Sequence, residues 1–474
     1  MRKNLFILTG LIICTAFMTF GCRKEEVTPI TVPDVLIEEI PSELPEEPTA
    51  EAPVTEEPIV KAPDEEYVHW SKLHDYHLDQ QDLAADGEFK NLTLQLGSNP
   101  DELHITWFSK SGSTGKVKFE AEGMFHDLSA KAETRPSHAV PGYHRNSALI
   151  KGLEANTTYT YHLQNGSHKS SNYTYTTSDL YSTDFTFTIA GDAEIGLGDI
   201  EEYDSQRSIW RVVLNRMRNE IPESSFLLSM GDQVGKSDSV ENYDYFLDNS
   251  VLYSTALVPV MGNHDVGSGF FPEHFRFPNL TDYCQSQGAD GDYWFVRGNA
   301  LFMVINTHTT MDYEDHEYFV AETVAKNPDA KWRIIISHVS PATVVDRYQD
   351  QREFWKDTFA DMAEDYDIDL FLGGHDHVYT RSYFLGDDCE PIPEQEFQLQ
   401  HEFHNPEHPI FVVFGSSTNA LFRSPDGPYP WAAISVQNDV PQLGKVQVTE
   451  NSFTITTYDA DHWTEVDHFT IYKD

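Results

Sequence analysis

Side chains that can bind metal ions recur at the ends of five apolar segments of this 474-residue sequence. Each segment has the composition of a buried strand, and polar residues just past such strands form the sites of helix-covered sheets. One such strand end is a weak sign because aspartate often caps turns, but five in order predict a metal site. Mixed carboxylate, amide and imidazole groups suit Zn, Fe or Mn. The residues are Asp192, Asp232, Asn263 with His264, His338, and His375 with His377.

The elements that would position these residues begin at about residue 184. Near-continuous apolar strands alternate there with helical stretches, which indicates a sheet covered on both faces in an α/β domain. The end of the chain, residues 443–472, returns to the alternation of antiparallel strands. The expected helices span residues 205–221, 240–249, 318–327 and 353–366.

Residues 89–177 have a different pattern, with short alternating segments separated by turn signals. About seven such strands in roughly ninety residues predict an immunoglobulin-like sandwich. Trp107 is expected to anchor the core of this sandwich, and the alternative is a platform that binds a ligand.

The start of the chain, MRKNLFILTGLIICTAFMTFGC, has the basic residues and short apolar run of a secretory signal. The alternative is a transmembrane anchor, but the run is short and contains Gly10 and three threonines. The stretch TFGC resembles a bacterial lipoprotein box, which implies that Cys22 is lipidated. The following RKEE resembles a signal that sends some lipoproteins to the cell surface. We therefore expect a lipid-anchored protein of the bacterial envelope, in the outer membrane. The RKEE stretch favours exposure at the cell surface, but the sequence does not decide which face of the membrane carries the protein.

Composition adds three further expectations. With 32 basic and 77 acidic residues the net charge is −45, which argues against binding nucleic acid through its phosphates. Residues 25–66 are rich in proline and glutamate and are expected to form an extended tether. Cys284 and Cys389 are an even pair in an exported protein and are expected to form a disulfide, with two free thiols as the alternative.

We divide the chain into a signal peptide (1–22), a tether (23–84), a sandwich (85–180) and an α/β domain (181–474).

Over residues 85–474 these motifs resemble the calcineurin-like metallophosphoesterases and, within them, the purple acid phosphatases. LEANTTYTYHL at 153–163 resembles the fibronectin type III-like domain that begins that family, and VDHFTIYKD at 466–474 resembles its ending. The resemblance implies an all-β immunoglobulin/fibronectin-like sandwich followed by a four-layer α/β metallophosphoesterase domain. It also implies two metal ions, which need a shared ligand when they lie ~3.5–4 Å apart.

The resemblance gives each ligand a place in that centre. Asp232 matches the position that bridges the two ions. One ion would take Asp192, Asp232 and His377, and the other would take Asp232, Asn263, His338 and His375.

The resemblance implies that His264 and Asp265 are catalytic and that Asn263, His264 and Arg381 bind the substrate. His264, beside Asn263, would face it and either steady the phosphoryl oxygens or protonate the leaving group. Asp265 would orient the His264 ring. Arg381 matches a family arginine that either braces the loop or contacts phosphate.

Two positions depart from the family pattern. Glu194 stands where many members of the superfamily have a histidine, and Gly235 stands where purple acid phosphatases have a tyrosine. The colour of iron-tyrosinate is therefore not expected. Glu194 either supplies a carboxylate oxygen to the first ion or hydrogen-bonds a metal-bound water. We expect an altered centre that still works.

These observations predict a metal-dependent phosphoesterase that hydrolyses phosphate monoesters and resembles an acid phosphatase. The alternatives are a phosphodiesterase or nucleotidase on the same fold, distinguished by loops such as 266–290 and 384–408, or a non-catalytic binding lipoprotein with a degenerate site. A small phosphorylated substrate and a membrane contact through the lipid alone are the expected partners. The sequence leaves the physiological substrate, metal identity, pH optimum and oligomeric state open.

Overall fold

The computed structural model describes residues 87–474 except 124–125, 282–290, 309–312, 394 and 396. The predicted signal peptide and its Cys22, the predicted tether, and Cys284 lie outside these residues. None of the helices in the described ranges is both long and apolar enough to cross a bilayer.

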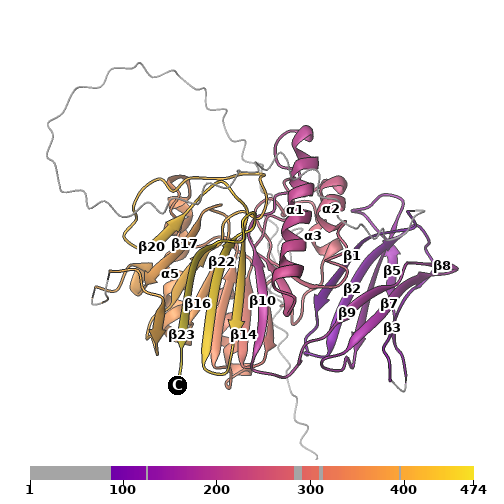
Figure 1. The fold of residues 1–474 in the computed structure, drawn as a ribbon, viewed down its shortest axis with the longest axis horizontal. Helices are drawn as coiled ribbons and strands as arrows, with labels where there is room; N and C mark the ends of the chain where they lie inside the picture. Colours follow the sequence, from indigo (N-terminus) through magenta and orange to yellow (C-terminus); the bar gives the residue numbers. More distant parts are fainter. Residues whose placement is uncertain (1–86, 124–125, 282–290, 309–312, 394, 396) are drawn as a thin grey trace, which may run out of the picture. The chain divides into compact units, whose positions relative to one another are not determined.

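The first described domain is a β-sandwich (Figure 1). Trp107 is completely buried in its core, and the indole Nε1 donates a hydrogen bond to Asn165 Oδ1 at 2.8 Å. The prediction that Trp107 anchors the core is confirmed. One sheet has the order β1 (Phe89–Leu96), β2 (Glu102–Ser109), β6 (His144–Lys151), β5 (Glu133–Pro136), and the other has the order β4 (Leu128–Lys131), β3 (Gly115–Glu120), β7 (Thr158–Asn165), β8 (His168–Lys169), with β9 (Tyr173–Thr176) also paired to β7.

Two seven-stranded sheets form the centre of the second domain. In each sheet the strands nearest the predicted site are parallel and almost entirely buried, as their continuous apolar sequences require. The first sheet has the order β12 (Ala256–Pro259), β11 (Ser224–Ser229), β10 (Phe185–Ala190), β21 (Gln442–Val448), β22 (Ser452–Asp459), β23 (Glu465–Tyr472), β18 (Glu402–His404). The second has the order β13 (Tyr293–Arg297), β14 (Ala300–Ile305), β15 (Trp332–Ser337), β16 (Leu370–Gly373), β19 (Ile410–Val413), β17 (Tyr379–Phe384), β20 (Ala432–Val436).

Aromatic side chains hold the two sheets together. Phe187 of the first sheet packs edge-to-face on Phe302 of the second, with ring centroids 5.5 Å apart. Helices cover the outer faces, and the apolar residues of both helical layers pack against the sheets in separate clusters. The predicted fold class, a β-sandwich followed by a four-layer α/β domain, is confirmed. The helices are α1 (Ile200–Glu220), α2 (Val240–Leu247), α3 (Phe271–His274), α4 (Tyr313–Lys326) and α5 (Gln349–Tyr366), with short 3-10 helices η2 (Asp346–Tyr348) and η3 (Asp387–Cys389).

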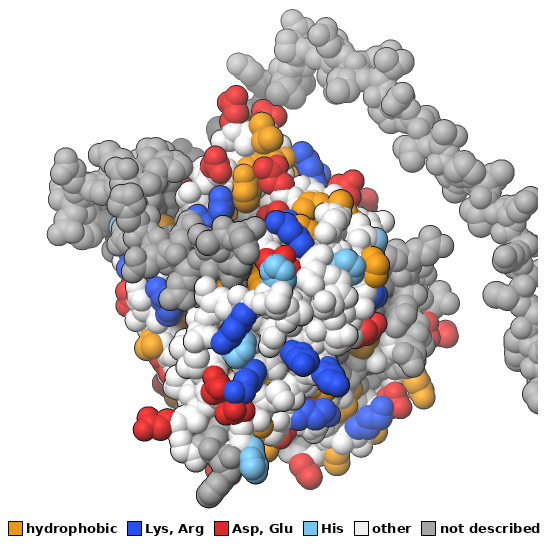
Figure 2. Space-filling model, turned by 90° about the vertical axis from the view of Figure 1, so that its right-hand side faces the viewer, with side chains coloured by type: hydrophobic (Ala, Val, Ile, Leu, Met, Phe, Trp, Pro, Cys, Tyr) orange, Lys and Arg blue, Asp and Glu red, His pale blue; other side chains and the backbone are white. Residues whose placement is uncertain are grey.

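Polar contacts join the sandwich to the α/β domain. Arg145 Nε donates to the carbonyl of Glu273 at 2.6 Å, and the hydroxyl of Tyr161 donates to the carbonyl of Tyr253 at 2.6 Å. The two domains differ in charge, because residues 87–180 hold nine acidic and nine basic residues whereas residues 181–474 hold 50 acidic and 17 basic. Figure 2 shows Lys and Arg side chains among Asp and Glu on one face of the molecule.

Cys389 lies in η3 with its thiol buried. The Sγ atom donates to the carbonyl of Lys356 at 3.2 Å, and burial raises the pKa of the thiol to about 12. Cys389 is a free thiol among the described residues. Because Cys284 lies outside them, the pairing of these two cysteines stays a prediction.

Replacing Phe187 by alanine is expected to lower the free energy of unfolding by about 3–5 kcal/mol, because it opens a cavity between the two sheets. Denaturant unfolding measures this change. Leu399→Ala, at a side chain that is 44% exposed, is the control and should change the value by less than about 0.5 kcal/mol. Equal effects of the two substitutions would contradict the assignment of the core.

Candidate metal centre

The predicted ligands come together where strands of both sheets end. Asp192 follows β10 and Asp232 follows β11, both in the first sheet, whereas His338 follows β15 in the second. His338 Nε2 lies 3.2 Å from Asp232 Oδ2 and 3.8 Å from Asp192 Oδ1. The parallel strands therefore deliver side chains from both sheets to one point.

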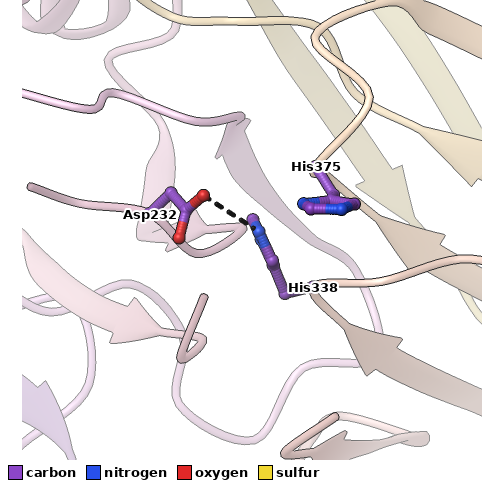
Figure 3. Close-up of side chains that lie close together, drawn as sticks. All are labelled: Asp232, His338 and His375. Carbon is purple, nitrogen blue, oxygen red and sulfur yellow. Dashed lines mark ion pairs between the residues drawn. The ribbon is translucent and has the colours of Figure 1, made fainter. Parts of the chain in front are cut away.

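Two overlapping groups of these residues have the geometry of metal sites. In the first, ligand atoms of Asp232, His338 and His375 all lie within 4.8 Å of one another, and Figure 3 shows Asp232 facing His338 with the His375 ring beside them. In the second, Glu194, Asp232 and His264 meet the same limit. Asp232 is common to both groups, which is the arrangement that a bridging carboxylate needs.

Several buried polar atoms at this point lack a hydrogen-bond partner within the described part of the chain. Buried polar atoms are nearly always paired in folded proteins, and several unpaired ones together indicate a missing ligand. All of them are atoms that coordinate metals, so the residues fit a metal centre. The atoms are Glu194 Oε2, Asn263 Oδ1, His338 Nε2 and His375 Nε2.

Backbone carbonyls fix the orientation of three histidine rings. His338 Nδ1 lies 2.8 Å from the carbonyl oxygen of residue 230, His377 Nδ1 2.9 Å from that of residue 421, and His264 Nδ1 3.0 Å from that of residue 235. A carbonyl only accepts, so each Nδ1 carries a proton, and Nε2 is the nitrogen left to bind a metal once it is deprotonated. For His338 and His377 that Nε2 faces the carboxylates.

The backbone at the site adopts conformations that few side chains favour. Glu194, Asp232, His375 and His377 all have positive φ, between 43° and 72°. At Gly262 a Cβ atom would lie 2.1 Å from Asp232 Oδ1, so only glycine allows this approach. Backbone strain of this kind concentrates at functional sites.

Glu194 lies inside the cluster. Its side chain is only 2% exposed, and its carboxylate oxygens lie 3.4 Å from His264 Nε2 and 3.6 Å from His377 Nε2. The loop that carries Glu194 also passes close to Gly235, where a Cβ would lie 2.3 Å from the backbone nitrogen of Leu197. The two departures from the family pattern are therefore linked, because the Glu194 loop fills the space that a tyrosine at 235 would need.

Burial shifts the pKa values of the acidic residues. It raises the pKa of Asp192 to about 7, and together with the charge of Asp232 it raises those of Glu194 and Asp265 well above the usual range. Burial alone would lower the pKa of His338, but Asp232 and Asp192 raise it to about 10. The pKa of Asp232 is lowered because the charge of His338 outweighs burial. Without added positive charge these carboxylates do not all ionise together.

The substrate-binding role of Arg381 is wrong. Its Nε and Nη2 donate to the two carboxylate oxygens of Asp467 at 2.7 and 3.0 Å, and its Nη1 donates to the carbonyl of Gln400 at 3.0 Å. The guanidinium is buried and committed to these partners. Arg381 therefore braces β17 against β23, which is the bracing role weighed from the sequence.

The role of Asp265 also needs correction. Its Oδ2 accepts hydrogen bonds from the backbone nitrogens of Gly262 at 2.9 Å and Gln233 at 3.4 Å. The carbonyl of Gly235, and not Asp265, orients the His264 ring. Asp265 thus holds two ligand-bearing loops together.

Three further residues beside the cluster were missed. His308 follows β14 with its ring centroid 5.4 Å from that of His338, and the Tyr348 ring lies tilted against His375 with centroids 4.0 Å apart. Arg423 lies 5.6 Å from the Tyr348 ring, and its charge acts on Glu194 and His377. His308 carries the same signal as the predicted ligands, a polar residue just past an apolar strand. Tyr348 and Arg423 lie in connecting segments that have no such pattern.

Comparisons with known proteins agree with this geometry. The family described as calcineurin-like phosphoesterase matches residues 167–379, and that described as purple acid phosphatase, N-terminal domain, matches residues 89–179. The solved structure of purple acid phosphatase PPD1 from yellow lupin (Lupinus luteus) seeds is similar with a TM-score of 0.65 and 15% identity, over 81% of this chain and 74% of that one. The structure of PhoD is similar with a TM-score of 0.53 and 13% identity, over 79% and 91%. At these identities the two structures show the fold.

The metal-free protein is expected to become less stable as the pH rises from 7 to 9. The pKa values of Asp192 and His338 are about 7 and 10 in the folded chain, against ordinary values of 3.8 and 6.5. The folded state therefore binds more protons than the unfolded state over this range, and unfolding is favoured as protons leave. Thermal unfolding of chelator-treated protein at both pH values measures the loss.

Metal-loaded protein is the control, because it shares every charge outside the centre. Bound metal takes the place of the protons, so the loss of stability between pH 7 and 9 should be smaller in the metal-loaded protein. A metal-free protein whose melting temperature holds or rises between pH 7 and 9 would contradict the predicted protonation.

Proposed function

Because the chain carries a calcineurin-like phosphoesterase domain behind a purple acid phosphatase N-terminal domain, we propose that it is a metal-dependent hydrolase of phosphate monoesters. The observation that carries this proposal is the position of Asp232 between two groups of ligand atoms. A degenerate binding protein has no need to keep both groups intact. The proposal also rests on the unpartnered buried atoms that aim into the cluster.

The proposed centre holds two ions, drawn from Zn, Fe and Mn. Asp192, Glu194 and His377 serve one ion, and Asn263, His338 and His375 serve the other, with Asp232 shared. Bound metals supply Lewis-acid stabilisation of the phosphoryl oxygens and a nucleophile at neutral pH. The carboxylate of Glu194 is the proposed ligand in the place of the usual histidine, and no tyrosinate colour is expected.

His264 is the residue proposed to meet the substrate. Its side chain is 33% exposed, whereas those of His338 and His377 are 0% and 3% exposed. The hydrogen bond from Nδ1 to the Gly235 carbonyl fixes the ring and leaves Nε2 toward the cluster, 3.4 Å from Glu194 Oε1. An imidazole in this place can steady a phosphoryl oxygen or hand a proton to the leaving group.

We also propose that the enzyme works at the bacterial envelope, held by lipid on Cys22. The basis is the signal-like start of the sequence and the proline-rich acidic segment that follows it. A cell-surface position in the outer membrane extends that proposal.

Removing the metals is expected to abolish hydrolysis of a chromogenic phosphate monoester, because the ligands alone supply neither nucleophile nor Lewis acid. Chelator-treated full-length protein should regain activity with Zn, Mn or Fe, and elemental analysis should find two ions per chain. Bis-esters assayed in parallel identify a phosphodiesterase if they react faster, and nucleoside monophosphates identify a nucleotidase. Metal-loaded protein that hydrolyses neither ester would overturn the proposal.

Glu194→Gln is expected to weaken binding of the ion that Asp192, Glu194 and His377 hold, because an amide carries no negative charge to bind it. Its affinity should fall by at least about 100-fold, leaving one ion per chain after dialysis, while Glu194→His should keep two. Elemental analysis and the monoester assay measure both effects. The control is Glu202→Gln, an exposed carboxylate in the first turn of α1. Two tightly held ions in Glu194→Gln would show that Glu194 is not a ligand.

A further inference from the structure

His308 presents a half-buried imidazole to the candidate centre without belonging to the predicted ligand set. Its ring centroid lies 5.4 Å from that of His338 and 6.5 Å from that of His375, while those two lie 5.0 Å apart. Its Nε2 atom is buried and has no hydrogen-bond partner among the described residues. An unpaired buried nitrogen next to a reaction centre indicates a ligand that the protein itself does not supply.

The ring geometry argues against His308 as a ligand of the same ion. In the described chain, the group whose ligand atoms all lie within 4.8 Å contains Asp232, His338 and His375 but not His308. His308 therefore lies outside this group of ligand atoms, beside the rings of His338 and His375. The unpaired Nε2 of His308 is thus left for a molecule other than the ion.

A chain of hydrogen bonds holds the His308 turn in place. The backbone nitrogen of His308 donates to Asn306 Oδ1 at 3.0 Å, and the backbone nitrogen of Asn306 donates to Asp292 Oδ1 at 2.8 Å. The hydroxyl of Thr307 accepts from the backbone nitrogen of Val339 at 3.3 Å, which ties the turn to the His338 loop. Asp292 is itself paired with the buried His316 at 2.6 Å. Such preorganisation is typical of a residue that binds a ligand.

We propose that His308 binds the substrate, with Nε2–H donating to a phosphoryl oxygen. This inference rests on the proposed function and adds a recognition residue to it. Arg423 lies 5.6 Å from the Tyr348 ring, which packs against His375, and its charge acts on Glu194 and His377. His308 lies beside His338 and His375, so the two residues offer separate donors to one phosphoryl group at the cluster. A tetrahedral oxyanion with several free oxygens fits both contacts, and a phosphate monoester keeps one more free oxygen than a diester.

The test measures binding of inorganic phosphate to the metal-loaded, full-length protein by calorimetry. His308→Ala is expected to raise the dissociation constant about 10- to 100-fold, the usual effect of losing a hydrogen bond to a charged group. His308→Gln keeps an N–H donor of similar reach and should recover part of the affinity. Because the contact forms in both ground and transition states, KM should rise more than kcat falls.

Elemental analysis and thermal unfolding of each variant accompany the calorimetry. His308→Ala should keep two ions per chain, and His408→Ala, at an exposed histidine, should match the wild type throughout. If His308→Ala does not fold, His308→Gln and His308→Asn, two amides of different reach, carry the comparison.

Two results would overturn the proposal. Loss of one ion from a folded His308 variant would make His308 a metal ligand, and unchanged phosphate affinity in a folded, loaded variant would remove the contact. The outcome is separable from the proposed function. A wild-type protein that binds phosphate through His308 and hydrolyses no ester would contradict the function and support the inference.

Discussion

The structure depends on placing several carboxylates close together, out of water. Asp192, Glu194, Asp232 and Asp265 are each at most 2% exposed, and His338 is the group of opposite charge that lies nearest to Asp232. Two like charges 4 Å apart repel by about 4 kcal/mol at an effective dielectric constant near 20. One imidazolium does not offset several such pairs. The cluster is therefore built for cations, and folding around it is coupled to their binding.

Two sheets are needed because neither one alone carries the ligands. The first sheet brings the carboxylates at 192 and 232, and the second brings the histidines at 338, 375 and 377. Their spacing is set by the aromatic layer around Phe187 and Phe302 and by the buried pair of Arg381 with Asp467. The arginine just past the last histidines thus matters to the site without contacting the substrate, because it fixes one sheet against the other.

The sequence was sufficient for the features that follow from periodicity. Apolar strands that end in polar residues predicted the α/β domain and the residues that meet in the cluster, because parallel strands end at the same edge of a sheet. The helix starts were less predictable, since α1 begins at Ile200 in a polar stretch without apolar periodicity. The partners of Asp265 and Arg381 could not be predicted, because they are backbone nitrogens and a carboxylate 86 residues away. Tyr348 and Arg423 reach the site through loop geometry, which periodicity does not encode.

Charge explains how an unusual glutamate and an unassigned arginine belong together. Two divalent ions bring four positive charges, and Asp192, Asp232 and Glu194 cancel three of them when ionised. A histidine at position 194 would cancel none, so Glu194 leaves the centre less attractive to an anionic phosphate. The charge of Arg423 acts on Glu194 and restores one positive charge on the same side. The α/β domain has only 17 basic residues against 50 acidic ones, so a cation kept here offsets what Glu194 removes. In this chain Glu194 and Arg423 therefore form one electrostatic unit beside the cluster.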